Sequence, residues 1–167
     1  MTGIRLGERL LYIGSGTPDM FGALAGKVGL SGQASGVAAS ESGAEALKGG
    51  GARAGALVDV QVAPGAGLPY DGESFDLVVL DCTRAAVDKS SHWLPETLRV
   101  LRGGGRVIVV EKTGGLRLWG LFDTGSSGSG PRAEAATRTL QATGFRPVRR
   151  IAQREGWRFT EGLRPRT

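Results

Sequence analysis

The sequence is poor in the residues that build disulfides and metal centres. Among its 167 residues there is a single cysteine, Cys82, and a single histidine, His92. One cysteine excludes an intrachain disulfide, a cysteine-based zinc site and an iron–sulfur cluster. We therefore expect no bound metal, and we expect Cys82 to be a small buried apolar residue.

Long apolar segments are also missing. No run approaches the roughly 18 residues that a membrane-spanning helix needs, and the N-terminus lacks the charged and apolar regions of a signal peptide. We expect a cytoplasmic protein that does not enter a membrane. The 167 residues suit one domain, residues 1–167, because a chain of this length can bury a substantial core.

Apart from one apolar segment, residues 113–130 have the composition of a linker. This stretch contains Gly114-Gly115 and the run from Gly125 to Gly130. Glycine and serine in this proportion are typical of linkers, because they have little surface to bury. We expect one flexible loop at about residues 113–130, and the apolar segment from Leu116 to Phe122 within it is able to dock on the sheet.

Acidic residues are scarce at the C-terminal end. Residues 1–130 carry 12 Lys/Arg and 13 Asp/Glu, whereas residues 131–167 carry 9 Arg and 3 Asp/Glu. This asymmetry permits a nucleic-acid surface or a solvated arginine-rich edge. We favour the solvated edge, because the nearby aromatic residues suit a core. A nucleic-acid face would use Arg146, Arg149, Arg150, Arg154 and Arg158.

Two glycines join the first strand to the first helix. The apolar run from Arg9 to Ile13 stops at Gly14-Ser15-Gly16, and Thr17 and Pro18 follow. Thr17 suits the N-cap of a helix and proline suits its first turn. In open parallel sheets such a turn lets a ligand approach the backbone, because glycine has no Cβ. The stretch predicts either a ligand-binding turn or a tight turn that binds nothing.

Segments of strand length and helix length alternate along the rest of the chain. The expected helices are Met20 to Val28, Glu41 to Lys48 (ended by Gly49, Gly50 and Gly51), Trp93 to Leu101, and Arg132 to Thr143. The expected strands after the first are Gln33 to Ala39, Ala56 to Val62, Phe75 to Leu80, Arg106 to Glu111, Arg146 to Gln153, and Trp157 to Glu161. This alternation predicts a parallel sheet with helices on both faces. Glu155-Gly156 predicts that the last two strands form an antiparallel hairpin.

Four blocks carry a resemblance to a known family. They are Leu10 to Thr17, Gly36 to Ser40, Leu68 to Val79, and Leu98 to Gly105. In their sequence and order these blocks resemble the class I S-adenosylmethionine-dependent methyltransferases, and the last two resemble the small-molecule enzymes of the quinone-biosynthesis type. The resemblance covers nearly the whole chain. It implies an α/β, Rossmann-like, doubly wound seven-stranded sheet whose last strand is antiparallel.

The resemblance also implies a cofactor, S-adenosylmethionine, and a set of positions that would hold it. Gly14 and Gly16 keep the approach to the backbone, and Leu68 keeps an apolar wall. Glu41 could turn toward the ribose, but the first turn of a helix also favours a glutamate for the helix dipole, and we prefer that second interpretation. The full set of implied cofactor positions is Gly14, Ser15, Gly16, Ala38, Glu41, Leu68 and Asp81.

Three acids of the family pattern are absent from these positions. Tyr12 stands where the family has an acid before the glycines, Ala38 where an acid grips the ribose, and Pro64 where an aspartate meets the adenine. Pro18 also replaces a third glycine. Charge-assisted hydrogen bonds contribute roughly 1.5–3 kcal/mol each. Loss of two would weaken binding by about 3–6 kcal/mol, or roughly two to four decades in affinity.

Catalytic residues are not identified by the pattern. Asp81 ends a strand at the expected ligand edge, where it could meet a substrate or the cofactor, or simply cap Thr83. His92 precedes a helix, so it could be a general base or an exposed neighbour of the cap. Glu111, at the end of the next strand, is a weaker candidate.

Two classes of function remain open. The first is a methyltransferase with weak or lost cofactor binding, acting on a small molecule by aligning a nucleophile with the methyl sulfonium. The second is an inactive binding or scaffold module with a protein partner, similar in kind to the N-terminal domain of anamorsin-like proteins. An RNA-associated methyltransferase is a third and weaker alternative.

Overall fold

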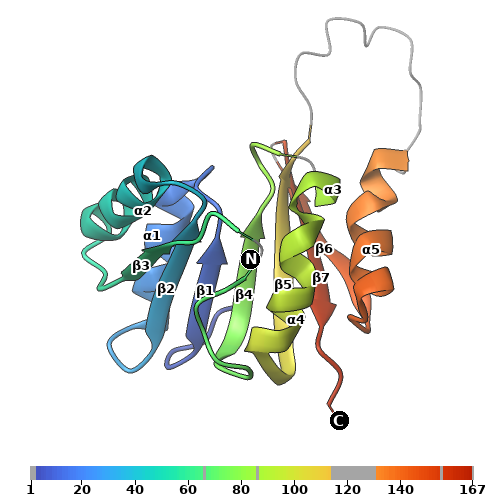
Figure 1. The fold of residues 1–167 in the computed structure, drawn as a ribbon, viewed down its shortest axis with the longest axis horizontal. Coiled ribbons are helices and arrows are strands. Elements are labelled where there is room, and N and C mark those ends of the chain that lie inside the picture. Colours follow the sequence, from blue (N-terminus) through green and yellow to red (C-terminus); the bar gives the residue numbers. More distant parts are fainter. Residues whose placement is uncertain (1–2, 66, 86, 114–130, 155, 167) are drawn as a thin grey trace, which may run out of the picture.

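A mixed seven-stranded sheet forms the centre of the molecule, with the strand order β3-β2-β1-β4-β5-β7-β6 (Figure 1). The computed structural model describes residues 3–65, 67–85, 87–113, 131–154 and 156–166. The strands are β1 (Arg9–Ile13), β2 (Gln33–Ala38), β3 (Asp59–Val62), β4 (Phe75–Asp81), β5 (Leu101–Lys112), β6 (Val148–Arg154) and β7 (Trp157–Leu163). Strands β1 to β5 are parallel, and β7 is antiparallel to β5 and β6. The predicted fold class and C-terminal hairpin are confirmed.

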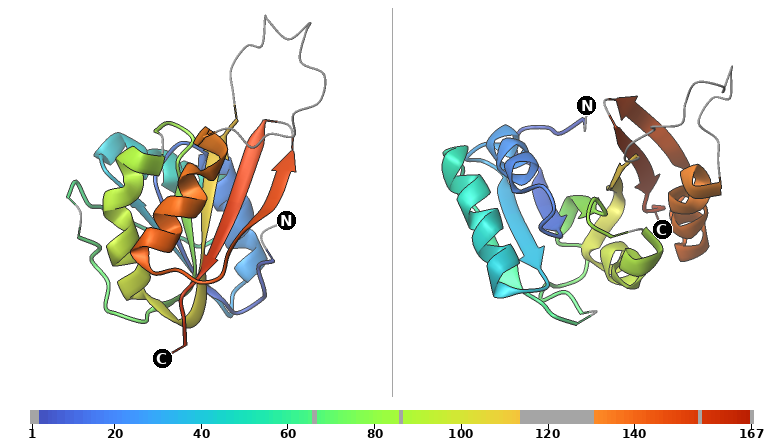
Figure 2. Two further views of the ribbon diagram at one scale, coloured as in Figure 1. Left: turned by 90° about the vertical axis from the view of Figure 1, so that its right-hand side faces the viewer. Right: turned by 90° about the horizontal axis from the view of Figure 1, so that it is seen from above.

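Helices cover both faces of this sheet (Figure 2). One face carries α1 (Pro18–Val28) and α2 (Glu41–Arg53). The other carries α3 (Val87–Ser90), the short 3-10 helix η1 (Ser91–Trp93), α4 (Leu94–Val100) and α5 (Pro131–Thr143). Side chains of β1 and β4 alternate between the two apolar cores. Because these strands are buried on both faces, their sequences are almost continuously apolar.

The parallel strands give the sheet two chemically different edges. We call the edge where β1 to β5 end the carboxyl edge, and the edge where they start the amino edge. Ile13 at the end of β1 pairs with Val37 of β2 and with Leu80 of β4. Asp81 therefore ends its strand beside the glycine turn. Strand order reverses around β1, and ligands of open α/β sheets bind at such a point, beyond the carboxyl ends.

The predicted end of the second helix is wrong. We expected Gly49, Gly50 and Gly51 to stop it, but α2 continues to Arg53. The glycines serve a close contact between helices, since a Cβ on Gly22 of α1 would lie 2.2 Å from the Gly50 carbonyl oxygen. Helix packing therefore overrides the low helix propensity of glycine. Ser40 caps the helix, with its hydroxyl accepting from the Gly43 N–H at 3.2 Å.

Other bounds differ by a few residues. β5 begins at Leu101, before the glycine run, because the pairing jumps from Phe75–Leu101 to Leu77–Arg106 and residues 102–105 bulge out. β3 begins at Asp59 rather than at Ala56. Of the predicted flexible loop, residues 114–130 lie outside the described part of the chain. Among the described residues, no helix is both long and apolar enough to cross a membrane.

Candidate functional site

The glycine turn at the carboxyl edge is packed against the chain's own polar side chains. A Cβ added to Gly16 would lie 2.1 Å from the Thr83 hydroxyl oxygen and 2.9 Å from each carboxylate oxygen of Asp81. A Cβ on Gly14, whose φ is +114°, would lie 3.0 Å from the Asp81 Cβ. Both positions therefore require glycine for the close approach of Asp81 and Thr83, whether or not a ligand also binds there.

Asp81 is a buried carboxylate that accepts hydrogen bonds on both oxygens. Its Oδ2 accepts from the Tyr12 hydroxyl at 2.7 Å, the Thr17 N–H at 2.8 Å and the Thr17 hydroxyl at 3.0 Å. Its Oδ1 accepts from the Thr83 N–H at 3.0 Å and the Thr83 hydroxyl at 2.6 Å. A carboxylate offers about four lone-pair sites. The Tyr12 and Thr17 hydroxyls also contact each other at 2.5 Å, and each carries one proton, so one of them donates to the other and four donors serve Asp81 at a time. Four donors fill its lone-pair sites, so Asp81 has no spare acceptor capacity for a ligand.

This carboxylate also occupies the start of α1. The Thr17 N–H points to Asp81, and the positive end of the helix dipole favours a negative charge there. Thr17 stands at the N-cap, but its side chain makes no capping hydrogen bond. We expected a conventional N-cap, and the structure differs because the hydroxyl turns to Asp81 instead. The anion position at this helix start is filled from within the chain.

Tyr12 connects the core to this network. Its side chain is buried, with its ring centroid 5.2 Å from that of Phe21. Burial, and then the neighbouring Asp81 charge, raise the pKa of the phenol well above its ordinary value. Tyr12 therefore stays a neutral donor. Where the resemblance implies an acid on β1, this chain has a tyrosine, and the carboxylate comes from the end of β4.

The position implied for the ribose is small and crowded. Ala38 at the end of β2 is buried, and a Cβ on Gly43 would lie 3.0 Å from both the Ala38 Cβ and the Ser15 hydroxyl oxygen. The glycine turn therefore packs directly against the first turn of α2. Glu41 is exposed in that first turn. An acid is available on α2, but none stands on β2.

Leu68 lies within the apolar core. It is buried in the same cluster as Ala63, Cys82 and Val87. Its N–H donates to the Glu96 carboxylate at 2.9 Å, and hydrogen bonds from Arg99 and from this N–H lower the pKa of Glu96 to about 2. The predicted burial of Cys82 is confirmed, and burial raises the pKa of its thiol to about 12.

The remaining catalytic candidates lie apart from the Asp81 network. His92 is exposed on η1, with Nδ1 3.0 Å from the Lys89 carbonyl oxygen. Glu111 is buried near the end of β5, with Arg158 Nη1 3.7 Å from its carboxylate. Among the described residues, the hydrogen-bond partners of Asp81 are Tyr12, Thr17 and Thr83, and they do not include His92 or Glu111. The same residues contain no group of three His, Cys, Asp or Glu side chains placed to hold a metal ion.

The C-terminal arginines are divided between environments. Arg149 is exposed and bonds to Glu161 at 2.7 Å, whereas Arg158 is buried beside Glu111. Arg149 pairs across the hairpin with Glu161 and Arg150 with Thr160, so the two arginines point to opposite faces of the sheet. These arginines do not share one surface.

Comparisons with known proteins agree with this architecture. Residues 11–109 match the model of a family described as "Methyltransferase domain". No curated protein matches the chain. A SAM-dependent methyltransferase from Aquifex aeolicus has a TM-score of 0.77 and 16% identity, covering 98% of this chain and 85% of that one. A SAM-dependent O-methyltransferase from Thermotoga maritima has a TM-score of 0.71 and 16% identity, covering 100% and 63%.

A third similar structure is the [4+2]-cyclase SpnF. Its TM-score is 0.71 at 18% identity, covering 99% of this chain and 77% of that one. At these identities the structures establish the fold alone, and the family match does not single out the quinone-biosynthesis type. The family match nevertheless spans more than half of the 167 residues. The chain therefore belongs to the methyltransferase-domain family, for which S-adenosylmethionine is the implied cofactor.

Proposed function

We propose that this protein is a methyltransferase-like domain that binds S-adenosylmethionine weakly, because its own side chains replace contacts that the cofactor would make. The saturated Asp81 network is the observation that carries this proposal. The glycines that would admit a ligand instead admit Asp81 and Thr83. The carboxylate that could meet a cationic cofactor already accepts from Tyr12, Thr17 and Thr83.

The residues present fit the cofactor only in part. The glycine turn and Glu41 are compatible with a nucleoside at the carboxyl edge. Ala38 offers no acceptor for ribose hydroxyls, and Leu68 is held in the core by its hydrogen bond to Glu96. Without two charge-assisted contacts, we expect a dissociation constant at or beyond roughly 100 μM.

Calorimetric titration with S-adenosylmethionine and S-adenosylhomocysteine tests the proposal. The unmodified protein should bind weakly, and Ala38→Asp should strengthen binding by roughly one to two decades through a bidentate contact to the ribose. Ala39→Asp is the matched control, because it adds the same charge at the neighbouring exposed position. Micromolar binding by the unmodified protein would contradict the proposal and favour an active enzyme.

A scaffold module is the second candidate. It is favoured by apolar surface at the amino edge, far along the strands from the cofactor position, where Leu30 and Leu57 are exposed. SpnF, named as a cyclase, illustrates that this fold alone does not fix the chemistry. If Ala38→Asp gains no affinity, the cofactor position is closed and the scaffold function is preferred.

A further inference from the structure

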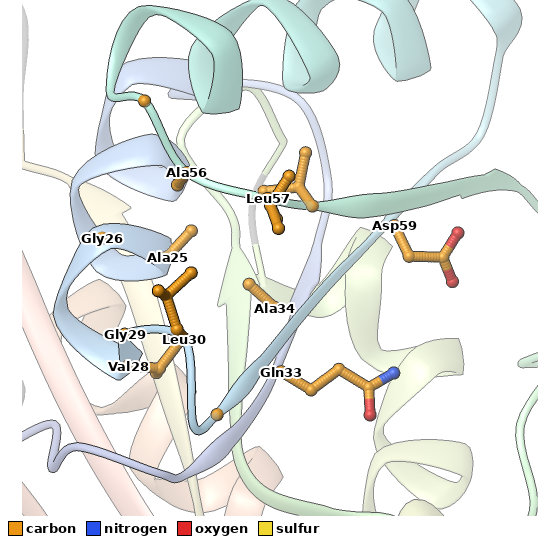
Figure 3. Close-up of a pocket in the computed structure, with 13 residues that line it drawn as sticks. Ala25, Gly26, Val28, Gly29, Leu30, Gln33, Ala34, Ala56, Leu57 and Asp59 are labelled. Atoms are coloured by element: carbon orange, nitrogen blue, oxygen red, sulfur yellow. The ribbon is translucent and has the colours of Figure 1, made fainter.

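The amino edge of the sheet carries an apolar groove of about 440 Å³ (Figure 3). It lies between the end of α1, the start of β2 and the segment that leads into β3. Its lining consists of Ala25, Gly26, Val28, Gly29, Leu30, Gly32, Gln33, Ala34, Gly55, Ala56, Leu57, Val58 and Asp59. The groove is therefore at the opposite ends of the strands from the glycine turn.

Large apolar side chains protrude around this groove. Among the described residues, the exposed large apolar side chains are Leu6 (79% exposed), Leu30 (94%) and Leu57 (84%). Leu30 and Leu57 line the groove, and Leu6 lies beside Gly29, where an added Cβ would be 3.0 Å from its Cδ2. Isolated exposed leucines are ordinary, but leucines gathered around an apolar hollow are typical of an interaction surface.

The groove is also nearly free of charge. Asp59 is the single charged residue in its lining, whereas 22% of the chain is charged. Depletion of charge at the centre is typical of protein interfaces. A neutral surface gives no attraction to a nucleic acid or to an acidic peptide. For a chain with a formal net charge of +5, it also marks a place where two copies can meet with little repulsion.

Strand β3 adds an open backbone edge next to the groove. In the part of the chain that the structure describes, β3 pairs with β2 and ends the sheet on that side. The outward N–H and C=O groups of an edge strand are a template for pairing with another strand. β3 spans only Asp59–Val62, so the apolar groove has to supply most of the contact.

We propose that this surface binds a second copy of the same chain, across a two-fold axis that passes near Leu57. A two-fold contact requires one surface to be complementary to itself. This surface carries both a hollow and protruding leucines, so Leu57 of each copy can enter the groove of the other. With the axis near Leu57, the β3 strands of the two copies extend away from it in opposite directions, so the contact is made by the leucines and the two grooves and the β3 edges do not pair with each other.

The size of the surface sets the expected strength of the dimer. The groove has 13 lining residues, of which β3 contributes only Asp59. Standard interfaces use about 20–30 residues on each side. A contact below that size corresponds to a weak dimer, with a dissociation constant on the order of 10–100 μM. The proposal does not depend on cofactor binding.

Sedimentation over a range of protein concentrations tests the dimer. The unmodified chain should pass from monomer to dimer across roughly 1–500 μM, with or without S-adenosylmethionine. Leu57→Glu and Leu30→Glu should each weaken association at least tenfold. Gln141→Glu is the control, because it adds the same charge at an exposed position on α5. A monomer at all concentrations would overturn the proposal, as would a dimer that both leucine variants leave intact.

Cross-linking locates the axis. The chain's one cysteine, Cys82, is buried, so an introduced surface cysteine reports on its own contacts. Leu57→Cys should form a disulfide-linked dimer under mild oxidation at a concentration that populates the dimer. Gln141→Cys should form much less under the same conditions. Equal cross-linking of the two variants would contradict an axis near Leu57.

Discussion

The two edges of the sheet differ in how their side chains are partnered. At the carboxyl edge, a buried carboxylate is paired within the chain, with Asp81 accepting from Tyr12, Thr17 and Thr83. At the amino edge, Leu30 and Leu57 stay in water beside an open groove. At the carboxyl edge, where ligands of open α/β sheets bind, the Asp81 carboxylate is thus paired within the chain. At the amino edge, large apolar side chains stay exposed. The surface that we propose to bind a partner therefore lies at the edge away from the glycine turn.

Replacement of Asp81 by asparagine should give the largest loss of stability. The amide of Asp81→Asn would turn an N–H₂ group toward donors of Thr17 or Thr83, and the negative charge at the start of α1 would be lost. We expect the free energy of unfolding to fall by about 3 kcal/mol, measured by urea denaturation. Asp59→Asn is the matched control at the amino edge, where the side chain is exposed. Equal losses for both variants would contradict the contrast between the edges.

Gly16→Ala should give the next largest loss. The φ of Gly16 lies outside the left-handed region, so alanine is sterically excluded by Thr83 and Asp81 and not by the backbone. We expect a loss of about 2 kcal/mol, as for other overpacked sites. Addition of Thr83→Ala removes the atom 2.1 Å from the new Cβ and should recover part of that loss. Strictly additive losses in the double variant would show that the close contact is not the cause.

Much of this fold follows from local sequence patterns. Continuous apolar strands and intervening helices predict the parallel sheet, and Gly156 predicts the hairpin turn. The predicted end of α2 was wrong because Gly50 contacts α1, and a local sequence pattern does not reveal a contact between residues so far apart in the chain. The strand predicted to begin at Arg106 begins at Leu101, because pairing with β4 makes the intervening glycine run a bulge within a longer strand.

The site was less predictable than the fold. The sequence showed that Tyr12 and Ala38 stand at positions where the family pattern has acids. The link from Tyr12 to Asp81 crosses 69 positions of sequence, and it depends on β1 and β4 being neighbours in the sheet. A tyrosine at the end of one strand and an aspartate at the end of its neighbour are a signal only once strand order is known. The groove depends similarly on three separate segments meeting at one edge.

Alkaline pH should lower the stability of the whole fold, because buried thiol and phenol groups keep protons that the unfolded chain loses. The pKa of Cys82 is about 12 in the fold against an ordinary value of 9.0. Between these values the unfolded chain loses a proton that the folded chain keeps, so stability falls as pH rises, by up to about 1.4 kcal/mol per pH unit. Tyr12 and Tyr70, whose pKa values are also raised by burial, add to the fall above about pH 10.

Cys82→Ala tests this alkaline loss. The variant should remove most of the fall in stability between about pH 9 and 10 and leave the steeper fall above pH 10, measured by urea denaturation at each pH. Tyr12→Phe should leave the fall between about pH 9 and 10 in place, because Cys82 still titrates first, and should reduce the steeper fall above pH 10. An unchanged profile between pH 9 and 10 in Cys82→Ala would show that the thiol is not the responsible group.

The smallest effect on folding is expected from Leu57→Glu at the amino edge. Leu57 is 84% exposed, so the monomer loses little buried apolar area when it is replaced. The free energy of unfolding at low protein concentration should stay within about 0.5 kcal/mol of the unmodified chain. At high concentration the unmodified chain gains stability from dimer formation by mass action, and the variant does not. The thermal midpoint should rise with protein concentration for the unmodified chain and stay constant for Leu57→Glu. That result would show that contacts between two copies stabilise the amino edge, whereas contacts within one chain stabilise the Asp81 network. Parallel rises for both proteins would mean that the copies associate through another surface.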